Sequence, residues 1–482
     1  MSLSGALSNA MSGLAANARG TSVISANIAN ALNEGFGRRE VVLSTDANQS
    51  SGGVRVAQVT RYSDPILSHQ KRLASAEFGY ASTIAGFASN VEQLWGSVDT
   101  PDSVANQMTK FETALVAAAS DPSSDTRLRN VSYAAESFAN SLRSASNGIQ
   151  QARTDAEKHI AASVDEMNGR LSKIEKLNHN IMTAKHVGQD VLALVDQREM
   201  ELDRLSEFVP LHVVERESGE VAVFTRQGRT LIDTRAVEIT FDGKPAVLSH
   251  MSVSNGLLSG LRVDGQNIDV SMDGPLSGGR LAATFELRDS AAPAVQARID
   301  AIARDLIDRF GAGGPDSTIN IGDPGVFTDA GGPFSPADET GLAGRIELNS
   351  TLATSGSDLW RWRDGLYAPS RGDVGTSGLI MDLRAQVSQS LVPGSLELGA
   401  TPNSLSGHVL GLSSKIAADR VRTSDLSEFA SVQLDQFRQA AAAEGVNTDQ
   451  ELQKLIELEK SYAANARVVQ VVDDMLAELL RI

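Results

Sequence analysis

Hydrophobic residues near the start of the chain recur at alternating steps of four and three. The series consists of Leu3, Leu7, Ala10, Leu14, Asn17, Thr21, Ile24, Ile28 and Ala31. This heptad spacing lines up one stripe along a helix and is typical of helices that pack on other helices. The glycines and asparagine of the following run, NEGFG at 33–37, predict that the helix ends there.

The far C-terminal region carries a second heptad series. Its members are Leu455, Leu458, Tyr462, Asn465, Val469, Val472, Leu476 and Leu479. Neither terminal helix has a third apolar face or a neighbouring element with which to build a globular core. Because packing supplies most helical stability, we expect the two helices to need each other or copies from other subunits.

Each series contains one asparagine, Asn17 in the first and Asn465 in the second. A single polar residue in an apolar seam usually lowers stability while it restricts register and partner. Both asparagines are therefore candidate register-setting residues. The alternative is chance polarity in short helices.

The stretch from Asp64 to Pro210 has a strongly helical pattern, with breaks at 99–102 and 120–123 where Pro follows Thr or Asp. One seam in it, which predicts a long bundle helix, consists of Ile160, Val164, Met167, Leu171 and Ile174. Before this stretch, residues 45–61 contain two glycines followed by spaced valines. They predict a short extended segment.

Residues 210–280 show the alternation and turn residues of β-hairpins. Strand candidates lie at 221–225, 230–233 and 237–241, and Asp-Gly pairs stand at 242–243 and 264–265. Helical periodicity returns in 281–310 and again beyond residue 378. Between them, 311–372 is rich in Gly, Pro, Asp and Ser and predicts an irregular excursion.

The predicted fold is mainly α with an inserted β domain. Paired terminal helices form a coiled-coil unit from 1–62 plus 445–482. A discontinuous helical-bundle domain consists of 63–209, 281–310 and 373–444. A small outer antiparallel β domain occupies 210–280, and the Gly/Pro-rich excursion occupies 311–372.

Composition narrows the classes of function. The net charge of −17 disfavours binding to nucleic acid or anionic lipid. No apolar run is long enough for membrane insertion, and residues 1–20 show no cleaved secretory signal. Without cysteine, the chain has no disulfide and no thiolate nucleophile or zinc ligand.

No motif for catalysis or cofactor binding stands out. Phosphate-binding loops, HExxH helices, GxSxG turns and kinase signatures are all absent from the sequence. His179 and His186 lie in a polar stretch and are expected to face solvent. We therefore predict no catalytic residue, no cofactor and no metal site, and a protein that is not an enzyme.

Some loop residues leave alternatives open. Turn geometry explains Asp264, Asp269 and Asp273 better than calcium binding does, because the EF-hand spacing is missing. The loop at 322–325 is likewise a turn first and an ion site second. Trp360 and Trp362 are expected to anchor the excursion, although partner or sugar binding is the other possibility.

The two ends also carry motifs. Residues 26–36 read ANIANALNEGF, and this run resembles the signature near the start of flagellar rod, hook and hook-associated proteins. Phe36 replaces the usual tyrosine, and Glu34 stands at a position that is commonly small or proline. Asn27 and Asn30 either cap the helix end or bridge to another subunit.

The C-terminal runs GVNTDQEL at 445–452 and YAANARVVQ at 462–470 look like the matching C-terminal motif of the same axial family. Within that family, hook and rod proteins pass quickly into β-rich domains, whereas this chain has a long helical region. Its runs LVDQR at 194–198 and GGRL at 278–281 are similar to segments of the hook-associated junction proteins.

The resemblance implies a structural subunit that joins hook to filament and lies outside the cell in the flagellum. Its terminal helices would pack as a coiled-coil layer lining the axial tube, after export from the cytoplasm by the flagellar type III system. The implied partners are hook protein, the second junction protein, other copies in a ring, and a cytosolic export chaperone on the C-terminal helix. The expected subunit-interaction residues are Leu3, Leu7, Leu14, Asn17, Ile24, Asn27, Ile28, Asn30, Leu455, Leu458, Tyr462, Asn465, Val469, Val472, Leu476 and Leu479.

Three other interpretations compete with the junction protein. A hook protein of the same family is disfavoured by the long helical bundle. A type III effector or translocator would not need matched motifs at both ends. A secreted enzyme carried on the filament would require a convergent polar site in residues 210–372.

Overall fold

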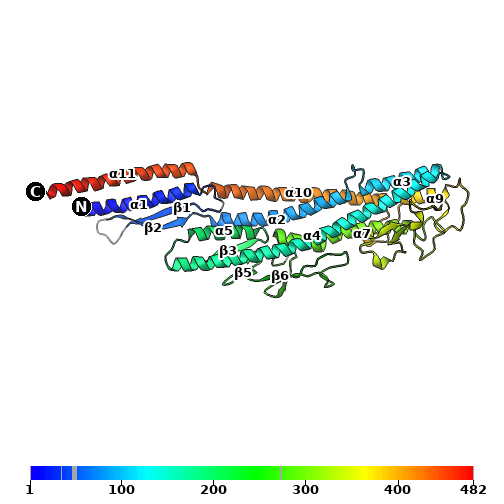
Figure 1. Ribbon diagram of the computed structural model, residues 1–482, viewed down its shortest axis with the longest axis horizontal. Helices are drawn as coiled ribbons and strands as arrows, with labels where there is room; N and C mark the ends of the chain where they lie inside the picture. Colours follow the sequence, from blue (N-terminus) through cyan, green and yellow to red (C-terminus); the bar gives the residue numbers. More distant parts are fainter. Residues whose placement is uncertain (1, 34, 46–51, 272–273, 481–482) are drawn as a thin grey trace. The chain divides into compact units, whose positions relative to one another are not determined.

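The computed structural model describes residues 2–33, 35–45, 52–271 and 274–480 (Figure 1). Two compact units share the chain. Unit 1 consists of Met1–Phe78, Glu166–Glu238 and Ala430–Ile482, and unit 2 of Gly79–Asp165 and Ile239–Phe429. Glu34 and Asp273, both considered above, lie outside the described residues.

Three long helices contribute to both units: α2 (Pro65–Trp95), α4 (Asp125–His186) and α10 (Leu405–Ala443). The predicted seam from Ile160 to Ile174 lies on α4, and its five members are at most 3% exposed. The prediction of a long bundle helix is therefore confirmed. Among the described helices, none combines the length and the apolar character that a membrane span requires.

Unit 1 contains the two terminal helices, α1 (Leu3–Ala29) and α11 (Thr448–Leu479), and also α5 (Leu192–Ser206). Figure 1 shows α1 and α11 side by side, as expected for paired terminal helices. Side-chain caps begin both helices. Ser2 Oγ accepts a hydrogen bond from Gly5 N, and Asn447 Oδ1 accepts from Asp449 N and Gln450 N.

Unit 1 also contains two small antiparallel sheets. β1 (Arg39–Thr45) pairs with β2 (Val54–Arg61), which includes the valines of the predicted extended segment. β3 (Leu211–Glu215), β4 (Val221–Thr225) and β5 (Thr230–Ile232) form the second sheet in that order.

Unit 2 adds α3 (Val104–Ser120), α6 (Gly279–Glu286), α7 (Ala292–Arg309), α8 (Arg361–Asp364) and α9 (Gly378–Ser388). A π-helical turn, Leu287–Ala291, joins α6 to α7. β6 (Ile239–Phe241), β7 (Leu261–Val263) and β8 (Gln266–Ile268) form one sheet. β9 (Phe327–Asp329) pairs with β10 (Ile346–Leu348) inside the excursion.

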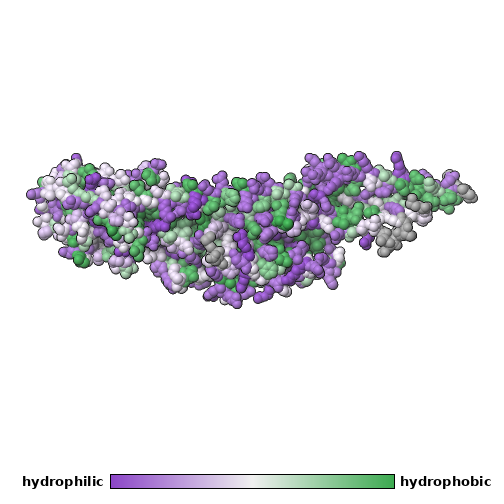
Figure 2. Space-filling model, turned by 180° about the vertical axis from the view of Figure 1, so that it is seen from behind, coloured by the Kyte–Doolittle hydropathy of each residue, from purple (hydrophilic) through white to green (hydrophobic). Residues whose placement is uncertain are grey.

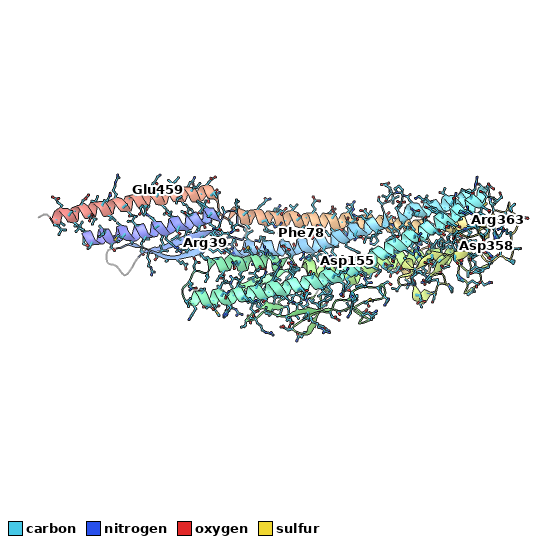
Figure 3. All side chains as sticks on the ribbon, in the orientation of Figure 1. Arg39, Phe78, Asp155, Asp358, Arg363 and Glu459 are labelled. Carbon is cyan, nitrogen blue, oxygen red and sulfur yellow. The ribbon has the colours of Figure 1, made fainter. Side chains whose placement is uncertain are left out.

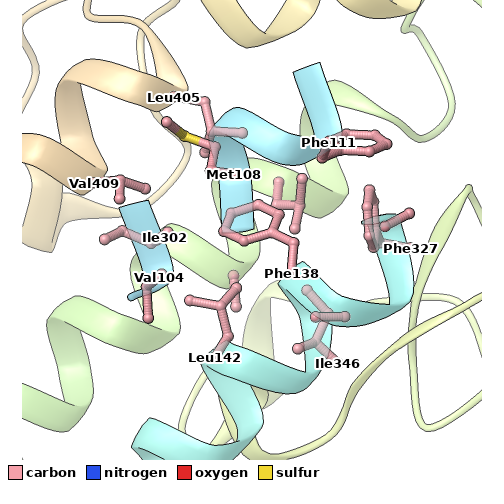
Figure 4. Close-up of a cluster of buried hydrophobic side chains, with 14 of the residues drawn as sticks. Val104, Met108, Phe111, Phe138, Leu142, Ile302, Phe327, Ile346, Leu405 and Val409 are labelled. Atoms are coloured by element: carbon pink, nitrogen blue, oxygen red, sulfur yellow. The ribbon is translucent and has the colours of Figure 1, made fainter. Parts of the chain in front are cut away.

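The core of unit 2 is a single cluster of buried apolar side chains drawn from helices and from the excursion (Figure 4). Phe111 is fully buried, with ring centroids 5.7 Å from Phe310 and 5.8 Å from Phe327. Trp362 is 1% exposed and donates from Nε1 to Ser132 Oγ at 2.8 Å. Burial of one large apolar side chain stabilises a fold by about 1.5–3 kcal/mol. The anchoring role expected for the tryptophans agrees with this burial.

The region 210–280 contains the predicted antiparallel strands, but in two sheets. β3, β4 and β5 belong to unit 1, and β6, β7 and β8 belong to unit 2. The prediction of a hairpin at Asp242-Gly243 is wrong, because β6 pairs with β7, which begins 20 residues after β6 ends. At Asp264-Gly265 the prediction is confirmed, since both residues adopt the positive φ that a two-residue β7–β8 turn requires.

Candidate assembly interface at the terminal helices

The helices α1 and α11 pack antiparallel through a face that contains two glycines. Gly13 lies opposite Asn465 and Gly20 opposite Leu458, so residue numbers rise along one helix as they fall along the other. A Cβ atom would lie 2.6 Å from Asn465 Nδ2 at the first position and 2.7 Å from Leu458 Cδ1 at the second. The lack of side chains at these two positions permits the close approach of the helices.

This face differs slightly from the predicted seam of α1. Asn17, Ile24 and Asn27 are buried in the single chain, together with Ala10, Ala16, Gly20 and Val23. The remaining predicted contact residues of this helix, all half-buried, are Leu3, Leu7, Leu14, Ile28 and Asn30. Thr21, a member of the predicted seam, is exposed. The α1 residues that contact α11 therefore include Gly13 and Gly20, each one position before a predicted seam residue, Leu14 and Thr21.

The predicted seam of α11 is only partly covered. Val472 is buried, and Leu455, Leu458, Asn465 and Val469 are half-buried. The exposed fractions are 50% for Tyr462, 40% for Leu476 and 59% for Leu479. Further apolar side chains of α11 that are more than 40% exposed are Leu452, Ile456, Val468, Val471 and Met475. Figure 2 shows apolar atoms at the surface in this part of unit 1.

The predicted asparagines have distinct surroundings. Asn17 Nδ2 donates to Ser461 Oγ of α11 at 3.0 Å. Asn27 is fully buried and bridges three segments, since its Nδ2 donates to Glu451 Oε2 and to Arg39 O, both at 2.9 Å. Its Oδ1 accepts from Arg39 N at 3.0 Å. Asn30 follows the last residue of α1, and its Nδ2 donates to Ala26 O at 2.9 Å, which is a capping role.

Glu451 of α11 was not among the predicted site residues, although it lies within the run 445–452. It is 2% exposed. Besides Asn27, its partners are Arg38 Nε at 3.5 Å and Lys454 Nζ at 3.6 Å from Oε1. A buried carboxylate needs such partners because its desolvation is costly. The next heptad position before Leu455 is 451, but an apolar series does not include it because the residue there is charged.

Asp196 of α5 is the second buried carboxylate beside the terminal segments, where Figure 3 labels Arg39 on β1. Its Oδ1 accepts from Arg61 Nε at 2.8 Å and from Gly37 N at 3.0 Å, and its Oδ2 lies 3.5 Å from Arg39 Nη2. Two consecutive arginines therefore reach different carboxylates. Arg38 contacts α11, and Arg39 contacts α5.

Two residues of the run LVDQR at 194–198 each hold a different β segment. Asp196 holds the β1–β2 hairpin, while Arg198 donates to Gly219 O at 2.6 Å and so holds the turn between β3 and β4. Arg198 is 2% exposed, and burial lowers its pKa. Arg72 of α2 completes this region with hydrogen bonds to Glu199 at 2.6 Å and Asp203 at 2.7 Å on α5.

Within the described residues, no group of three or more His, Asp or Glu side chains is arranged to hold a metal ion. His179 and His186 are exposed, as predicted. Asp264 lies in the β7–β8 turn, and Asp269 Oδ1 accepts from Ser271 N at 2.8 Å, which is a turn contact. These positions agree with the turn interpretation.

Comparison with known proteins identifies the family. A family model described as the helical domain of flagellar hook-associated protein FlgK matches residues 88–313, and one described as the C-terminal region of flagellar basal body rod FlgEFG proteins matches residues 439–482. Flagellar hook-associated protein 1 of Bacillus subtilis (strain 168) is 23% identical over 511 residues, which cover 98% of this chain and 97% of the relative.

Two further similarities are partial. The protein of the same name from Escherichia coli (strain K12) is 26% identical over 242 residues, 48% of this chain and 43% of the relative. The solved flagellar hook junction protein FlgK from Burkholderia pseudomallei aligns over 54% of this chain and 46% of its own, at 20% identity and a TM-score of 0.44. From the family models and the full-length relative, the chain belongs to the family of flagellar hook-associated proteins.

Proposed function

We propose that this protein joins the flagellar hook to the filament and acts by assembly, not by catalysis. The observation that carries the proposal is the terminal helix pair, which leaves a row of apolar side chains on α11 uncovered in the single chain. Isolated apolar residues on a surface need no explanation, but a contiguous apolar stripe marks an interaction site. In a flagellar hook-associated protein, that stripe suits contacts with other axial subunits.

In this proposal, the segments 1–62 and 445–482 form the axial coiled-coil unit. Other copies in a ring, the hook protein and the second junction protein cover its exposed stripe. The sixteen residues predicted from the two heptad series and from the N-terminal motif supply the contacts, together with the exposed neighbours on α11.

Export through the flagellar type III system is part of the proposal. Tyr462, Leu476 and Leu479 remain exposed in the single chain. Such an apolar stripe promotes aggregation before assembly, and a helix-binding groove is a common way to cover one. A cytosolic chaperone on α11 would supply that cover, and the protein would then leave the cytoplasm for the flagellum.

The test is an in-frame deletion of the gene in a motile strain, examined by motility assays and electron microscopy. We expect hooks without filaments and flagellin in the medium. The full-length protein should restore filaments, whereas a chain lacking Leu455 to Ile482 should not. As a matched control, Tyr133→Ser changes a residue that is 68% exposed in unit 2 and should restore filaments fully. Normal filaments in the deletion strain would contradict the proposal.

A further inference from the structure

We infer that Glu451 sets the register in which α1 and α11 pair, through a polar cluster with Asn27 and Arg38. The inference deepens the proposed function and rests on it in one respect, because it concerns the helix pair through which the protein is proposed to assemble. The contacts themselves all lie within unit 1. They make the register a property of the single chain.

Most of the α1/α11 contact does not discriminate between registers. In the observed pairing, Gly13, Asn17 and Gly20 lie opposite Asn465, Ser461 and Leu458. A shift of one heptad, about 10.5 Å along the axis, would place Val472 against Gly13 and Asn465 against Gly20. Since glycine accommodates any of these partners, the shifted contact is also sterically permitted.

The cluster around Glu451 does discriminate. The same shift would place Leu458 against the buried amide of Asn27 and would separate Glu451 from Asn27 and Arg38. Asn27 cannot turn away to find another acceptor, because both of its side-chain polar atoms are held by the backbone of Arg39 at 2.9 and 3.0 Å. A carboxylate that has lost Asn27 and Arg38 and keeps only Lys454, and an amide against an apolar side chain, both disfavour the shifted register.

The asparagines predicted to set the register contribute less specificity. Asn17 makes one hydrogen bond across the helix pair, at 3.0 Å, to Ser461, which is exposed. Water can replace Ser461 as the acceptor in the shifted register at small cost. Asn465 lies against Gly13, which has no side chain to pair with it. Glu451 is 2% exposed and has partners on two other segments, so the shift breaks more of its contacts.

The absence of cysteine from the chain allows a direct test by disulfide cross-linking of the purified full-length protein. The pair Asn17→Cys with Ser461→Cys reports the observed register, and Asn17→Cys with Val468→Cys reports the shifted one. In the native background we expect the first pair to form a disulfide on mild oxidation. The second pair should remain reduced.

Glu451→Leu should raise the yield of the second disulfide at least tenfold, at the expense of the first. Glu451→Gln keeps an acceptor for Asn27 and should retain the native pattern. Glu457→Leu, the same change at an exposed position of α11, is the matched control and should also retain it. Circular dichroism of each variant checks that the helices remain.

Two results would overturn the inference. One is the native pattern in Glu451→Leu, which would show that other contacts set the register. The other is loss of both disulfides, either in Glu451→Leu or in the native background, which would show that Glu451 does not select between paired arrangements. Because no flagellum is needed, failure here is distinct from failure of the filament experiment.

Discussion

Unit 2 buries a continuous cluster of apolar side chains, whereas unit 1 joins its terminal segments through buried polar clusters. In unit 2, α3, α4, α7 and α10 share one core with the strands of the excursion. In unit 1, the carboxylate of Asp196 holds three groups from distant parts of the chain, and that of Glu451 holds two, besides Lys454 of its own helix. Much of the apolar surface of α11 stays uncovered.

The difference shows how one chain can be both stable and open to assembly. Apolar burial is non-directional and stabilises unit 2 without any partner. Buried ion pairs add little net stability compared with apolar packing. When one member of a buried pair loses its partner, however, the unpaired charge is costly, so buried ion pairs favour one arrangement over others. Unit 1 can therefore hold its terminal helices in a defined arrangement while it leaves apolar surface for neighbouring subunits.

The largest expected effect comes from a cavity in unit 2. Phe111→Ala removes a ring that lies within 6.4 Å of Trp362 and closer to Phe310 and Phe327, centroid to centroid. We expect a loss of about 3–5 kcal/mol in the free energy of unfolding. All three tryptophans lie in unit 2, so urea unfolding followed by tryptophan fluorescence measures this unit. Val116→Ala, at a 49% exposed position of the same helix, is the control and should cost less than about 1 kcal/mol.

The next largest effect concerns the polar cluster of unit 1. Asp196→Ala leaves the Arg61 and Arg39 guanidinium groups and the Gly37 N–H without their acceptor. A cost of about 2–3 kcal/mol is expected. Hydrogen exchange of β1, β2 and α5 should accelerate, while the fluorescence transition of unit 2 stays in place. Glu207→Ala, at an exposed position after α5, serves as the control. Unchanged exchange in Asp196→Ala would show that apolar contacts hold this region.

One histidine in unit 1 and one aspartate in unit 2 should make opposite contributions to the pH dependence of stability. In unit 1, His69 lies beside His212, with ring centroids 5.8 Å apart, and near Arg72 and Arg226, the latter paired with Glu77. Burial and these cations lower the pKa of His69. The unfolded chain therefore takes up the proton first. Because the folded state binds this proton less tightly than the unfolded chain does, the free energy of unfolding of unit 1 decreases as the pH falls below about 6.5.

In unit 2, burial raises the pKa of Asp300 to about 6, although Gly341 N, Ala343 N and Gln296 Nε2 all donate to it. The folded state then binds the proton more tightly, and stability is lost as the pH rises from about 4 to about 6. The free energy of unfolding of each unit is measured between pH 4 and 7 in the wild type and in the His69→Gln and Asp300→Asn variants. Parallel pH profiles of the wild type and the variants would contradict these assignments.

The smallest expected effect is on unit 2 when α11 is removed. A chain that ends before Thr448 should keep the fluorescence transition of unit 2 within about 0.5 kcal/mol, because the core of unit 2 contains no residue of α11. Hydrogen exchange in α1 should accelerate in the same protein. A shift of more than about 1 kcal/mol would show that the terminal pair supports the core of unit 2.

Much of the fold was predictable because helices and turns leave local patterns. The breaks at 99–102 and 120–123 match the gaps between α2, α3 and α4. The turn at Asp264-Gly265 follows from the backbone that these residues allow. The hairpin at Asp242-Gly243 was not formed because a favourable turn pair cannot decide which strand is the partner. β6 pairs instead with β7, whose side chains Leu261 and Val263 are buried.

The sequence by itself determined the two terminal helices, the helical bundle and the family, because heptad spacing and the terminal motifs are local features of the chain. Tertiary structure decided the face along which α1 meets α11, the roles of Glu451 and Asp196, and the division of the strands between two units. These depend on residues that are far apart in sequence, such as Asn27 and Glu451. A carboxylate in a polar run shows neither its burial nor its partner until the chain has folded around it.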